Sequence, residues 1–349
     1  MSSDSNSATP KPASGPFDGV PKVIVTTRLP AEIEERLTAL FETQLCINDE
    51  GMSADELKQA VQSCDVLVPT VTDHITADII AAASPRLKMI ANFGAGTNHI
   101  DVRAAYDRGI MVTNTPGVLT EDTADLTLAL ILAVPRRLVE GDRISRAGQF
   151  KGWAPTALLG HRVRGKRLGI IGMGRIGQAV ARRAHAFGLE VHYHNRRPLS
   201  TPIEDALAAT YWGELDAMLP HIDILSINCP LTPSTQHMMN AQRLALMSAD
   251  SYIVNTSRGG VIDEDALANA LALGQIGGAG LDVYEHEPLI HPKLLDLPNV
   301  VLAPHIGSAT HESRLEMGEK VLINIHAYTD HHRCPDRVLP PRQTVSEAS

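Results

Sequence analysis

A short apolar segment followed by three closely spaced glycines constrains the fold of this chain more than any other feature. Residues 168–171 read Leu-Gly-Ile-Ile, which is typical of a buried β-strand. The glycines after it have the spacing G-x-G-x-x-G, and they are Gly172, Gly174 and Gly177. The first permits a tight turn, the second lets a pyrophosphate approach the backbone, and the third lets the next helix pack on the strand. The pattern predicts a dinucleotide site at the start of that helix, with further contacts from Arg175 and Ile176.

The end of the next predicted strand indicates which dinucleotide is bound. Residues 189–194 form that strand, and Asn195, Arg196 and Arg197 follow it directly. NAD sites usually have an acidic residue here for the ribose 2′-hydroxyl, whereas arginine forms forked, charge-assisted hydrogen bonds with a 2′-phosphate. We therefore expect these three residues to contact the cofactor, and NADP(H) to be preferred over NAD(H). The alternative is an ordinary solvated turn, with NAD(H) as the cofactor.

Strand and helix patterns alternate along the chain, which predicts an α/β protein with two doubly wound parallel-sheet domains, the central one a Rossmann dinucleotide-binding domain. We expect a disordered N-terminal tail over residues 1–20 and a C-terminal tail over residues 336–349 that lies along the surface. A discontinuous, flavodoxin-like substrate-binding domain is expected over residues 21–120 and 308–335, and the Rossmann domain over residues 121–307.

Six strands are expected in the Rossmann domain and four in the other domain. They are residues 168–172, 190–194, 224–228, 252–255, 279–282 and 300–303, and residues 22–26, 66–69, 87–91 and 110–113. One long helix is expected over residues 121–148, kinked at Pro135 because proline cannot donate the helical hydrogen bond. Its first half is apolar on nearly every face, which favours burial between domains or at a dimer contact.

Charge and cysteine content exclude several classes of protein. The formal net charge of the 349 residues is −9, which argues against a general nucleic-acid binder because phosphate binding needs a basic surface. The four cysteines are scattered, as in a reduced cytoplasmic protein, and the pair His192 and His194 has no third ligand nearby, so no metal site is expected. The first 19 residues lack the apolar segment of a signal peptide, and no apolar stretch is long enough to cross a bilayer, so no membrane association is expected.

Three charged or titratable residues that follow predicted strands are the candidate catalytic groups: Arg258, Glu287 and His305. Because the carboxyl ends of parallel strands meet at one edge of a sheet, we expect them to lie together. The combination suits carbonyl reduction, in which His305 would protonate the oxygen while Glu287 orients the ring and favours the imidazolium. Arg258 would bind a substrate carboxylate and polarise the adjacent oxygen. Taken singly, each is more simply explained as an ordinary loop residue.

Three further features are candidate binding elements. Gly94, Ala95 and Gly96 follow a predicted strand, and their successive amides would form an anion-binding nest for a substrate carboxylate; a plain tight turn is the alternative. Cys229 is interpreted as an apolar wall near the adenine rather than a nucleophile, because no base is evident. Trp153 is interpreted either as part of a substrate pocket or as an interface residue.

Taken together, these motifs resemble the D-isomer-specific 2-hydroxyacid dehydrogenase family over residues 22–328. The segments that carry the likeness are residues 92–96, 172–177, 255–260, 280–285 and 304–307. The resemblance implies that Arg258, Glu287 and His305 are the catalytic set and that the backbone amides of residues 94–96 bind the substrate carboxylate. It also implies cofactor contacts at Pro230, Thr235, Thr256, Asp282 and His305, with Asp282 beside the nicotinamide. Members are usually dimers built around the helix after Thr120, so a homodimer is expected.

Within this family, Glu287 stands where formate dehydrogenases have glutamine, and the chain ends before the regulatory domain of many phosphoglycerate dehydrogenases. The segment 195–197 resembles the glyoxylate/hydroxypyruvate reductase branch. The resemblance therefore implies an oxidoreductase that uses NADPH to reduce glyoxylate or hydroxypyruvate to glycolate or D-glycerate. One alternative is an NAD-linked enzyme for a bulkier or different hydroxy acid. Another is a non-catalytic nucleotide sensor, similar to the corepressors that share this fold.

Overall fold

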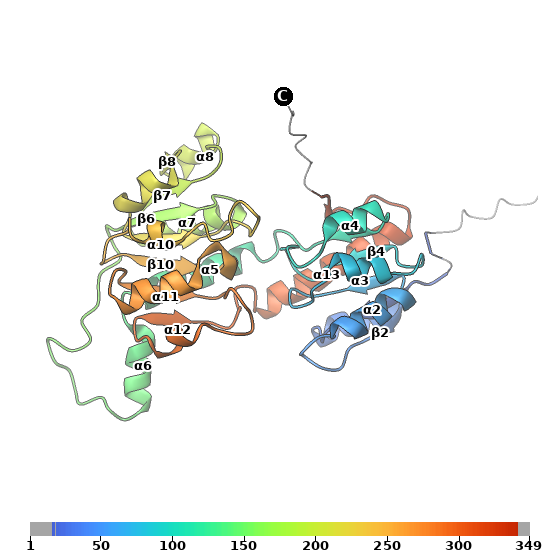
Figure 1. Ribbon diagram of the computed structural model, residues 1–349, viewed down its shortest axis with the longest axis horizontal. Coiled ribbons are helices and arrows are strands. Elements are labelled where there is room, and N and C mark those ends of the chain that lie inside the picture. The colour runs from blue at the N-terminus through green and yellow to red at the C-terminus, as the bar shows by residue number, and fades with distance from the viewer. Residues whose placement is uncertain (1–15, 18, 341–349) are drawn as a thin grey trace, which may run out of the picture. The chain divides into compact units, whose positions relative to one another are not determined.

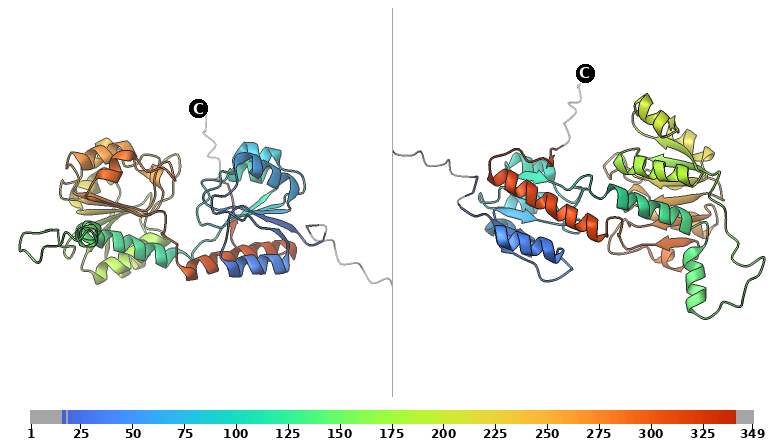
Figure 2. Two further views of the ribbon diagram at one scale, coloured as in Figure 1. Left: turned by 90° about the horizontal axis from the view of Figure 1, so that it is seen from below. Right: turned by 180° about the vertical axis from the view of Figure 1, so that it is seen from behind.

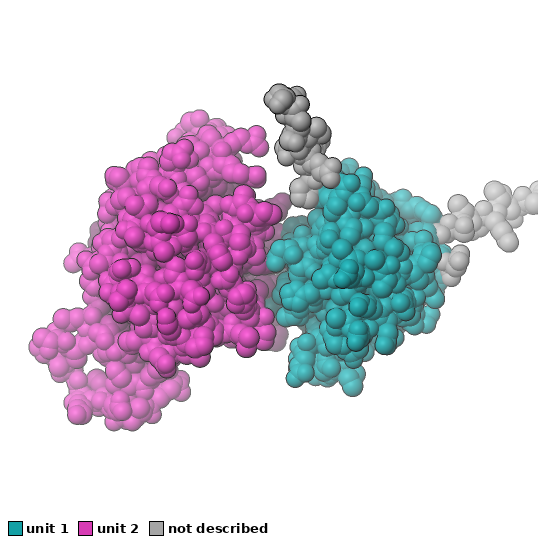
Figure 3. Space-filling view, in the orientation of Figure 1, with its two compact units in different colours: residues 1–116, 314–349 teal, residues 117–313 magenta. Residues whose placement is uncertain are grey.

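The protein is described by a computed structural model that covers residues 16, 17 and 19–340. The chain forms two compact units, the first made of residues 1–116 and 314–349 and the second of residues 117–313 (Figure 3). The sequence placed the divisions after residues 120 and 307, so residues 117–120 and 308–313 belong to the second unit instead of the first. Ser313 belongs to the second unit because its hydroxyl group donates hydrogen bonds to the carboxylate of Asp122 and to the carbonyl oxygen of Val118, the latter at 3.1 Å.

The first unit is built on a six-stranded sheet with the order β13-β5-β4-β3-β1-β2. The strands are β1 (Lys22–Val25), β2 (Glu42–Gln44), β3 (Val66–Val68), β4 (Met89–Ala91), β5 (Met111–Thr113) and β13 (Arg337–Val338). The first five are parallel and follow the order 2-1-3-4-5 that defines a flavodoxin-like sheet. The sequence missed β2 because its three residues, Glu-Thr-Gln, are polar and half-exposed.

Helices cover both faces of this sheet (Figure 1). They are α1 (Ala31–Leu40), α2 (Ala54–Ser63), α3 (Ala77–Ala82), α4 (Val102–Asp107) and α13 (His311–Thr329). Figure 2 shows α1 and α13 side by side on one face, with α2, α3 and α4 on the opposite face. The helices α1 and α13 approach closely at Gly318, where a Cβ atom would lie 2.3 Å from a side-chain carbon of Ile33.

Both ends of the first unit extend further than the sequence predicted. β13 pairs antiparallel with β5, Val338 lying opposite Val112, and Asp336 accepts a hydrogen bond from Asn324 Nδ2 at 3.0 Å. Phe17 is buried and packs edge-on against Tyr328, with ring centroids 5.5 Å apart. The predicted tails therefore do not reach residue 20 or begin at residue 336. The sequence did not predict these contacts, because a two-residue strand and a single buried aromatic ring produce no periodic hydrophobic pattern. The remaining tail residues, 1–15, 18 and 341–349, lie outside the described residues.

The second unit is a seven-stranded parallel sheet with the order β12-β11-β10-β9-β6-β7-β8. Its strands are β6 (Arg167–Ile171), β7 (Glu190–His194), β8 (Ala209–Trp212), β9 (Ile224–Ile227), β10 (Tyr252–Asn255), β11 (Gly278–Leu281) and β12 (Val300–Leu302). In chain order this is the 3-2-1-4-5-6 arrangement of a Rossmann domain with one added strand. The order reverses between β6 and β9, which is where such sheets bind ligands. β8 was not predicted, since this edge strand is half-exposed and lacks an apolar run.

The expected long helix over residues 121–148 is two helices, α5 (Thr120–Ala133) and α6 (Leu138–Arg146). The break covers residues 134–137 and includes Pro135, and Arg137 has the positive φ of 52° that turns the chain into α6. α5 is buried against β11, where a Cβ atom on Gly280 would lie 3.0 Å from Leu130. The prediction of a single kinked helix is therefore wrong, although Pro135 does lie where the helical segment is interrupted.

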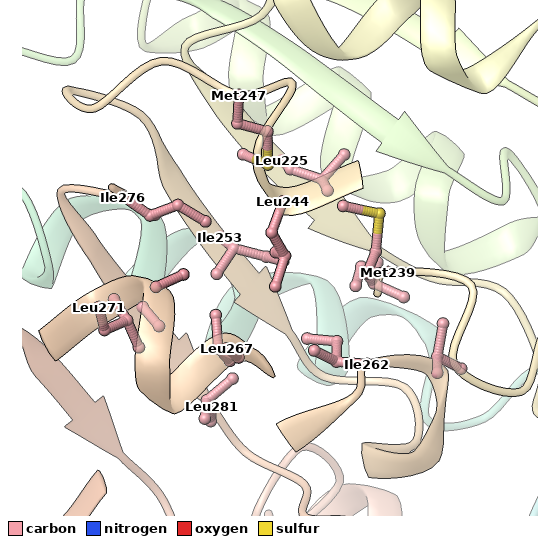
Figure 4. Packing of buried hydrophobic residues seen from close by; sticks show 14 of the residues in the cluster. Leu225, Met239, Leu244, Met247, Ile253, Ile262, Leu267, Leu271, Ile276 and Leu281 are labelled. Carbon is pink, nitrogen blue, oxygen red and sulfur yellow. The ribbon is translucent and has the colours of Figure 1, made fainter. Parts of the chain in front are cut away.

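Two hydrophobic cores hold the second unit together, one on each face of the sheet. One packs α5 and α7 (Arg175–Ala186) against the sheet, and Leu168, Ile170 and Val180 are buried in it. The opposite core lies beneath α10 (Ala241–Leu244) and α11 (Glu264–Ala272), as Figure 4 shows for Leu225, Ile253, Leu267 and other residues. The smaller elements are α8 (Thr201–Ala206), α9 (Leu215–Met218), α12 (Pro292–Asp296) and the 3-10 helices η1 (Leu219–His221) and η2 (Gly259–Val261).

Candidate active site

The glycine turn after β6 has the geometry that a dinucleotide requires. Gly172 has a φ of +92°, and a Cβ atom there would lie 2.6 Å from the backbone nitrogen of Cys229. A Cβ atom on Gly177 would lie 2.3 Å from the carbonyl oxygen of Gly172, so α7 can start only with glycine at this position. At Gly174 the Cβ direction is open. These residues fit a bound dinucleotide, with room for a pyrophosphate next to the first turn of α7.

The start of α7 leaves donor groups for such an anion. Gly174 is its N-cap, and no side chain in the described chain caps it. The amides of the first turn, at Arg175, Ile176 and Gly177, therefore carry the partial positive charge of the helix N-terminus without an internal acceptor. The predicted contacts at Arg175 and Ile176 lie in this turn.

Asn195 is joined directly to the glycine turn. Its Oδ1 accepts a hydrogen bond from the amide of Met173 at 2.8 Å, which fixes the end of β7 against the turn. Arg196 and Arg197 follow it on an exposed loop. The sequence suggested that Asn195 contacts the cofactor, but it gave no sign of this second function as a support of the glycine turn.

The segment after β9 lies across the point where the strand order reverses. Cys229 is buried, and burial raises the pKa of its thiol to about 11. Thr235 closes the loop that follows, because its hydroxyl donates to the carbonyl oxygen of Pro230 at 2.7 Å. Thr256, after β10, is tied to Thr127 of α5 by a hydroxyl–hydroxyl distance of 2.7 Å. The burial and the raised pKa fit the interpretation of Cys229 as an apolar wall rather than a nucleophile.

Glu287 and His305 form a hydrogen-bonded pair. His305 Nδ1 lies 2.7 Å from Glu287 Oε2, and Oε1 of the same carboxylate accepts from the amide of Tyr284 at 3.0 Å. Burial alone would raise the pKa of Glu287, but the bond to His305 and the charges of His305 and Arg258 outweigh it and lower the pKa. Because the carboxylate is ionised, Nδ1 carries the proton between them, and Nε2 is the ring atom that can exchange a proton with a substrate.

Asp282 fixes the loop that carries His305. Its Oδ1 accepts from the amide of Ile306 at 2.7 Å and its Oδ2 from the amide of Gly307 at 2.8 Å. His305 itself has a φ of 56°, an unfavourable region for a residue with a side chain, so its backbone needs this support. Asp282 is buried, and burial raises the pKa of its carboxyl group. The two carboxylate oxygens thus bind the loop, a function that the sequence did not indicate.

Arg258 lies on the loop after β10 and is half-buried. Burial lowers the pKa of its guanidinium group, and the charge of Glu287 opposes this effect. Asn255 shapes the loop by donating from Nδ2 to the carbonyl oxygen of Arg258 at 2.9 Å. The loop packs against the segment before Glu287 so closely that a Cβ atom on Gly259 would lie 1.8 Å from Tyr284. The structure therefore brings Arg258, Glu287 and His305 to the same edge of the second unit.

A second His–Glu pair joins the segment after β9 to the loop of Glu287. His237 Nε2 lies 2.5 Å from Glu285 Oε1, and His237 has a φ of 48°. Sequence reasoning missed this pair, because the two residues are 48 positions apart on different loops and no motif links them.

The turn of Gly94, Ala95 and Gly96 lies in the first unit and is held from beneath by asparagine side chains. Asn92 is fully buried, and its Nδ2 donates to the carbonyl oxygens of Gly94 at 2.8 Å and Gly96 at 3.0 Å. Asn114 Nδ2 donates to the carbonyl oxygen of Ala95 at 2.7 Å. All three carbonyl groups are thus bound on one side, as expected of a turn whose amides bind an anion.

Trp153 lies in the segment between α6 and β6 and is 86% exposed. Other apolar side chains of this region are also exposed, namely Leu138, Phe150, Leu158 and Leu159. Exposed apolar side chains that gather in one segment make that segment a candidate interaction surface.

Neither a metal site nor a membrane span is found in the part of the chain that the structure describes. No group of three or more His, Cys, Asp or Glu residues among residues 16, 17 and 19–340 is arranged to hold a metal ion. Within the same residues, every helix is too short or too polar to cross a bilayer.

Comparison with known proteins places these features in a family. The family model described as "D-isomer specific 2-hydroxyacid dehydrogenase, NAD binding domain" matches residues 128–307. Glyoxylate reductases from Thermococcus litoralis and Korarchaeum cryptofilum are 44% and 45% identical over 312 residues, which cover 88% of this chain and 93% and 92% of theirs.

Solved structures agree with this result. The NADPH-dependent glyoxylate/hydroxypyruvate reductase from Sinorhizobium meliloti, in complex with NADP and malonate, has a TM-score of 0.82 at 34% identity and covers 93% of this chain and 99% of that one. A protein from Thermus thermophilus has a TM-score of 0.84 at 43% identity, with coverage of 91% and 100%. This chain therefore belongs to the D-isomer-specific 2-hydroxyacid dehydrogenases, a family of NAD(P)-dependent oxidoreductases.

Proposed function

We propose that this enzyme reduces a small 2-oxo acid, glyoxylate or hydroxypyruvate, to glycolate or D-glycerate and prefers NADPH to NADH. The observation that carries the proposal is the Glu287–His305 pair beside Arg258, in the same unit as the glycine turn. The relatives that share 41–45% of their residues with this chain and are named glyoxylate reductase support the choice of substrate.

The chemistry follows from the site residues. A bound nicotinamide supplies the hydride for the carbonyl carbon of the 2-oxo acid. His305 Nε2 donates the proton that the carbonyl oxygen needs, while Glu287 holds the ring through Nδ1. Arg258 binds the substrate carboxylate and polarises the adjacent oxygen. The amides of residues 94–96, in the other unit, are a second candidate group for carboxylate binding. A positioned acid of this kind contributes about 10²–10⁴ in rate.

The cofactor preference rests on Arg196 and Arg197. No acidic residue stands at 195–197 to bind a ribose 2′-hydroxyl, and both arginines are exposed at the strand end where a 2′-phosphate would lie. Replacing both with alanine should lower kcat/KM for NADPH about tenfold or more, since each forked contact to phosphate is charge-assisted. kcat/KM for NADH should change about twofold at most.

The proposal extends to the assembly, a homodimer, and to the location, the cytoplasm. The exposed apolar side chains between α6 and β6 support a homodimer, and Trp153 is then an interface residue. Sedimentation of the wild type and of Trp153→Ser tests this, since a dimer should weaken in the variant. The four cysteines are free thiols in the described chain, which supports a cytoplasmic protein.

One kinetic panel tests the proposed activity. NADPH and NADH are each combined with glyoxylate, hydroxypyruvate, pyruvate and a bulky 2-oxo acid. The proposal requires the highest kcat/KM with NADPH and one of the first two acids. A higher kcat/KM with the bulky acid would overturn the substrate, a higher one with NADH would overturn the cofactor preference, and nucleotide binding without turnover would support the sensor.

A further inference from the structure

The loop that carries Arg196 and Arg197 is held at both ends by tyrosine hydroxyl groups. At its start, Tyr211 of β8 donates from its hydroxyl to the carbonyl oxygen of Asn195 at 3.1 Å. At its end, the amide of Leu199 donates to the hydroxyl of Tyr193 at 2.8 Å. β7, β8 and α8, which surround this loop, lie next to one another in Figure 1.

The Tyr193 hydroxyl is bonded on both its donor and its acceptor side. It accepts from Leu199 and donates to the carboxylate of Glu204 on α8. Burial, and then the hydrogen bond to Glu204, raises the pKa of Tyr193 to about 12, so the phenol keeps its proton at neutral pH. The hydroxyl therefore links the loop to a helix through two fixed bonds.

In both tyrosines the ring and the hydroxyl group have different functions. Tyr193 is fully buried in the core beneath α7, and its ring centroid lies 5.3 Å from that of Tyr211. A phenylalanine ring would fill the same space, whereas a buried hydroxyl is costly unless it is hydrogen-bonded. The Tyr211 hydroxyl binds the start of residues 195–199 and the Tyr193 hydroxyl binds their end. The rings therefore fill the core, and the hydroxyl groups fix the loop.

A third hydrogen bond fixes the loop to the glycine turn, and a proline restricts its backbone. Asn195 Oδ1 accepts from the amide of Met173 in the glycine turn, at 2.8 Å. Pro198 follows the two arginines and restricts the backbone between Arg197 and Leu199. The backbone of the two arginines thus spans two anchored ends, while their side chains extend into solvent.

We propose that Tyr193 and Tyr211 are positioning residues that preorganise residues 195–199, so that Arg196 and Arg197 meet the 2′-phosphate of NADP(H) without first ordering the loop. This inference rests on the NADPH preference proposed above. Binding to a loop that is already ordered avoids the entropy cost of fixing it, and the gain applies only to a ligand that the loop touches. The two hydroxyls therefore act on the 2′-phosphate and not on the rest of the nucleotide.

The test compares 2′-phospho-ADP with ADP, which differs from it only in lacking the 2′-phosphate, by calorimetric titration. The wild type should bind 2′-phospho-ADP about tenfold or more tighter than ADP. Tyr193→Phe and Tyr211→Phe should each reduce this ratio about three- to tenfold, and the double variant should reduce it further. Affinity for ADP should stay within about twofold of the wild type in each case.

Tyr252→Phe is the matched control. Tyr252 lies in the same core, and within the described chain its hydroxyl makes no hydrogen bond to residues 195–199. It should leave the ratio unchanged. If Tyr193→Phe does not fold, Tyr211→Phe at the half-exposed edge strand gives the same test.

The outcomes separate this inference from the proposal on which it rests. Equal wild-type affinities for the two ligands would overturn both the NADPH preference and the positioning function. If the wild type binds the 2′-phosphorylated ligand more tightly and the tyrosine variants keep the same affinity ratio, the positioning function alone would be overturned. A parallel loss of affinity for both ligands would do the same, because the hydroxyls would then support the nucleotide site as a whole. Glyoxylate turnover does not enter these measurements.

Discussion

His305 Nδ1 lies 2.7 Å from Glu287 Oε2, although the two residues are 18 positions apart in the chain. The contact exists because His305 follows β12 and Glu287 follows β11, and these neighbouring parallel strands end at the same edge of the sheet. Asp282, at the end of β11, then holds the two amides that come directly after His305. Asp282 thus fixes the backbone next to His305, and Glu287, on the loop that follows, fixes the imidazole ring.

Glu287→Gln should show a pH-dependent loss of stability. The pKa of Glu287 in the folded protein lies below its ordinary value of 4.5, so its ionisation stabilises the fold above that value. The contribution is lost as the pH falls through the folded-state pKa. The difference in the free energy of unfolding between wild type and variant should therefore be full at about pH 6 and shrink at about pH 4. Urea unfolding at both pH values measures it, and a difference that grows on acidification would contradict the assignment.

Asp282→Asn should lower activity through the backbone of His305. The amide side chain has one acceptor oxygen, so the amide of Ile306 or Gly307 loses its partner in a buried site, which costs about 1–3 kcal/mol. We expect a lower melting temperature and a kcat reduced about tenfold or more, with NADPH affinity close to that of the wild type. Asp296→Asn, on an exposed residue of α12, is the control. A normal kcat in a folded Asp282→Asn protein would show that the loop does not need this carboxylate.

Gly94→Ala should weaken substrate binding while leaving the nucleotide site intact. A Cβ atom on Gly94 would lie 2.8 Å from Cγ1 of Val71 and 3.2 Å from Nδ2 of Asn92, so the turn must shift to accept it. The amides that we assign to the substrate carboxylate would then be displaced, and KM for glyoxylate should rise about tenfold. Gly141→Ala on α6, where a Cβ atom meets open space, is the matched control. An unchanged KM would exclude the turn from carboxylate binding.

Thiol alkylation tests the inert character of Cys229. Burial raises the pKa of Cys229 to about 11 and that of Cys64 to about 12, so neither forms thiolate at mildly alkaline pH. Cys46 is half-exposed, and peptide mass spectrometry after iodoacetamide treatment should show it modified first. Unfolding in urea should expose all four thiols. Rapid modification of Cys229 in the folded protein would indicate a reactive thiolate near the nucleotide.

The sequence predicted the parts of the fold that repeat or that need a particular residue. The glycine turn was recognisable because Gly172 and Gly177 stand where a Cβ atom would collide with backbone. The parallel sheets were predictable from the alternation of strand and helix. The candidate catalytic residues could be grouped because parallel strand ends share one edge.

What the sequence missed depends on contacts between distant residues. β8 and β13 are edge strands with polar or half-exposed residues, so they lack the apolar pattern of a buried strand. The support that Asp282 gives to His305, and that Asn92 gives to the turn at Gly94, is a matter of single hydrogen bonds in three dimensions. No spacing in the sequence encodes them.

The most direct test of the central claim is the turnover of His305→Ala with NADPH and glyoxylate, measured beside its affinity for NADPH. If His305 donates the proton, kcat should fall about 10²–10⁴-fold while the dissociation constant for NADPH stays within about twofold of the wild type. A kcat close to that of the wild type would remove His305 from the reaction and would contradict the mechanism proposed for this site.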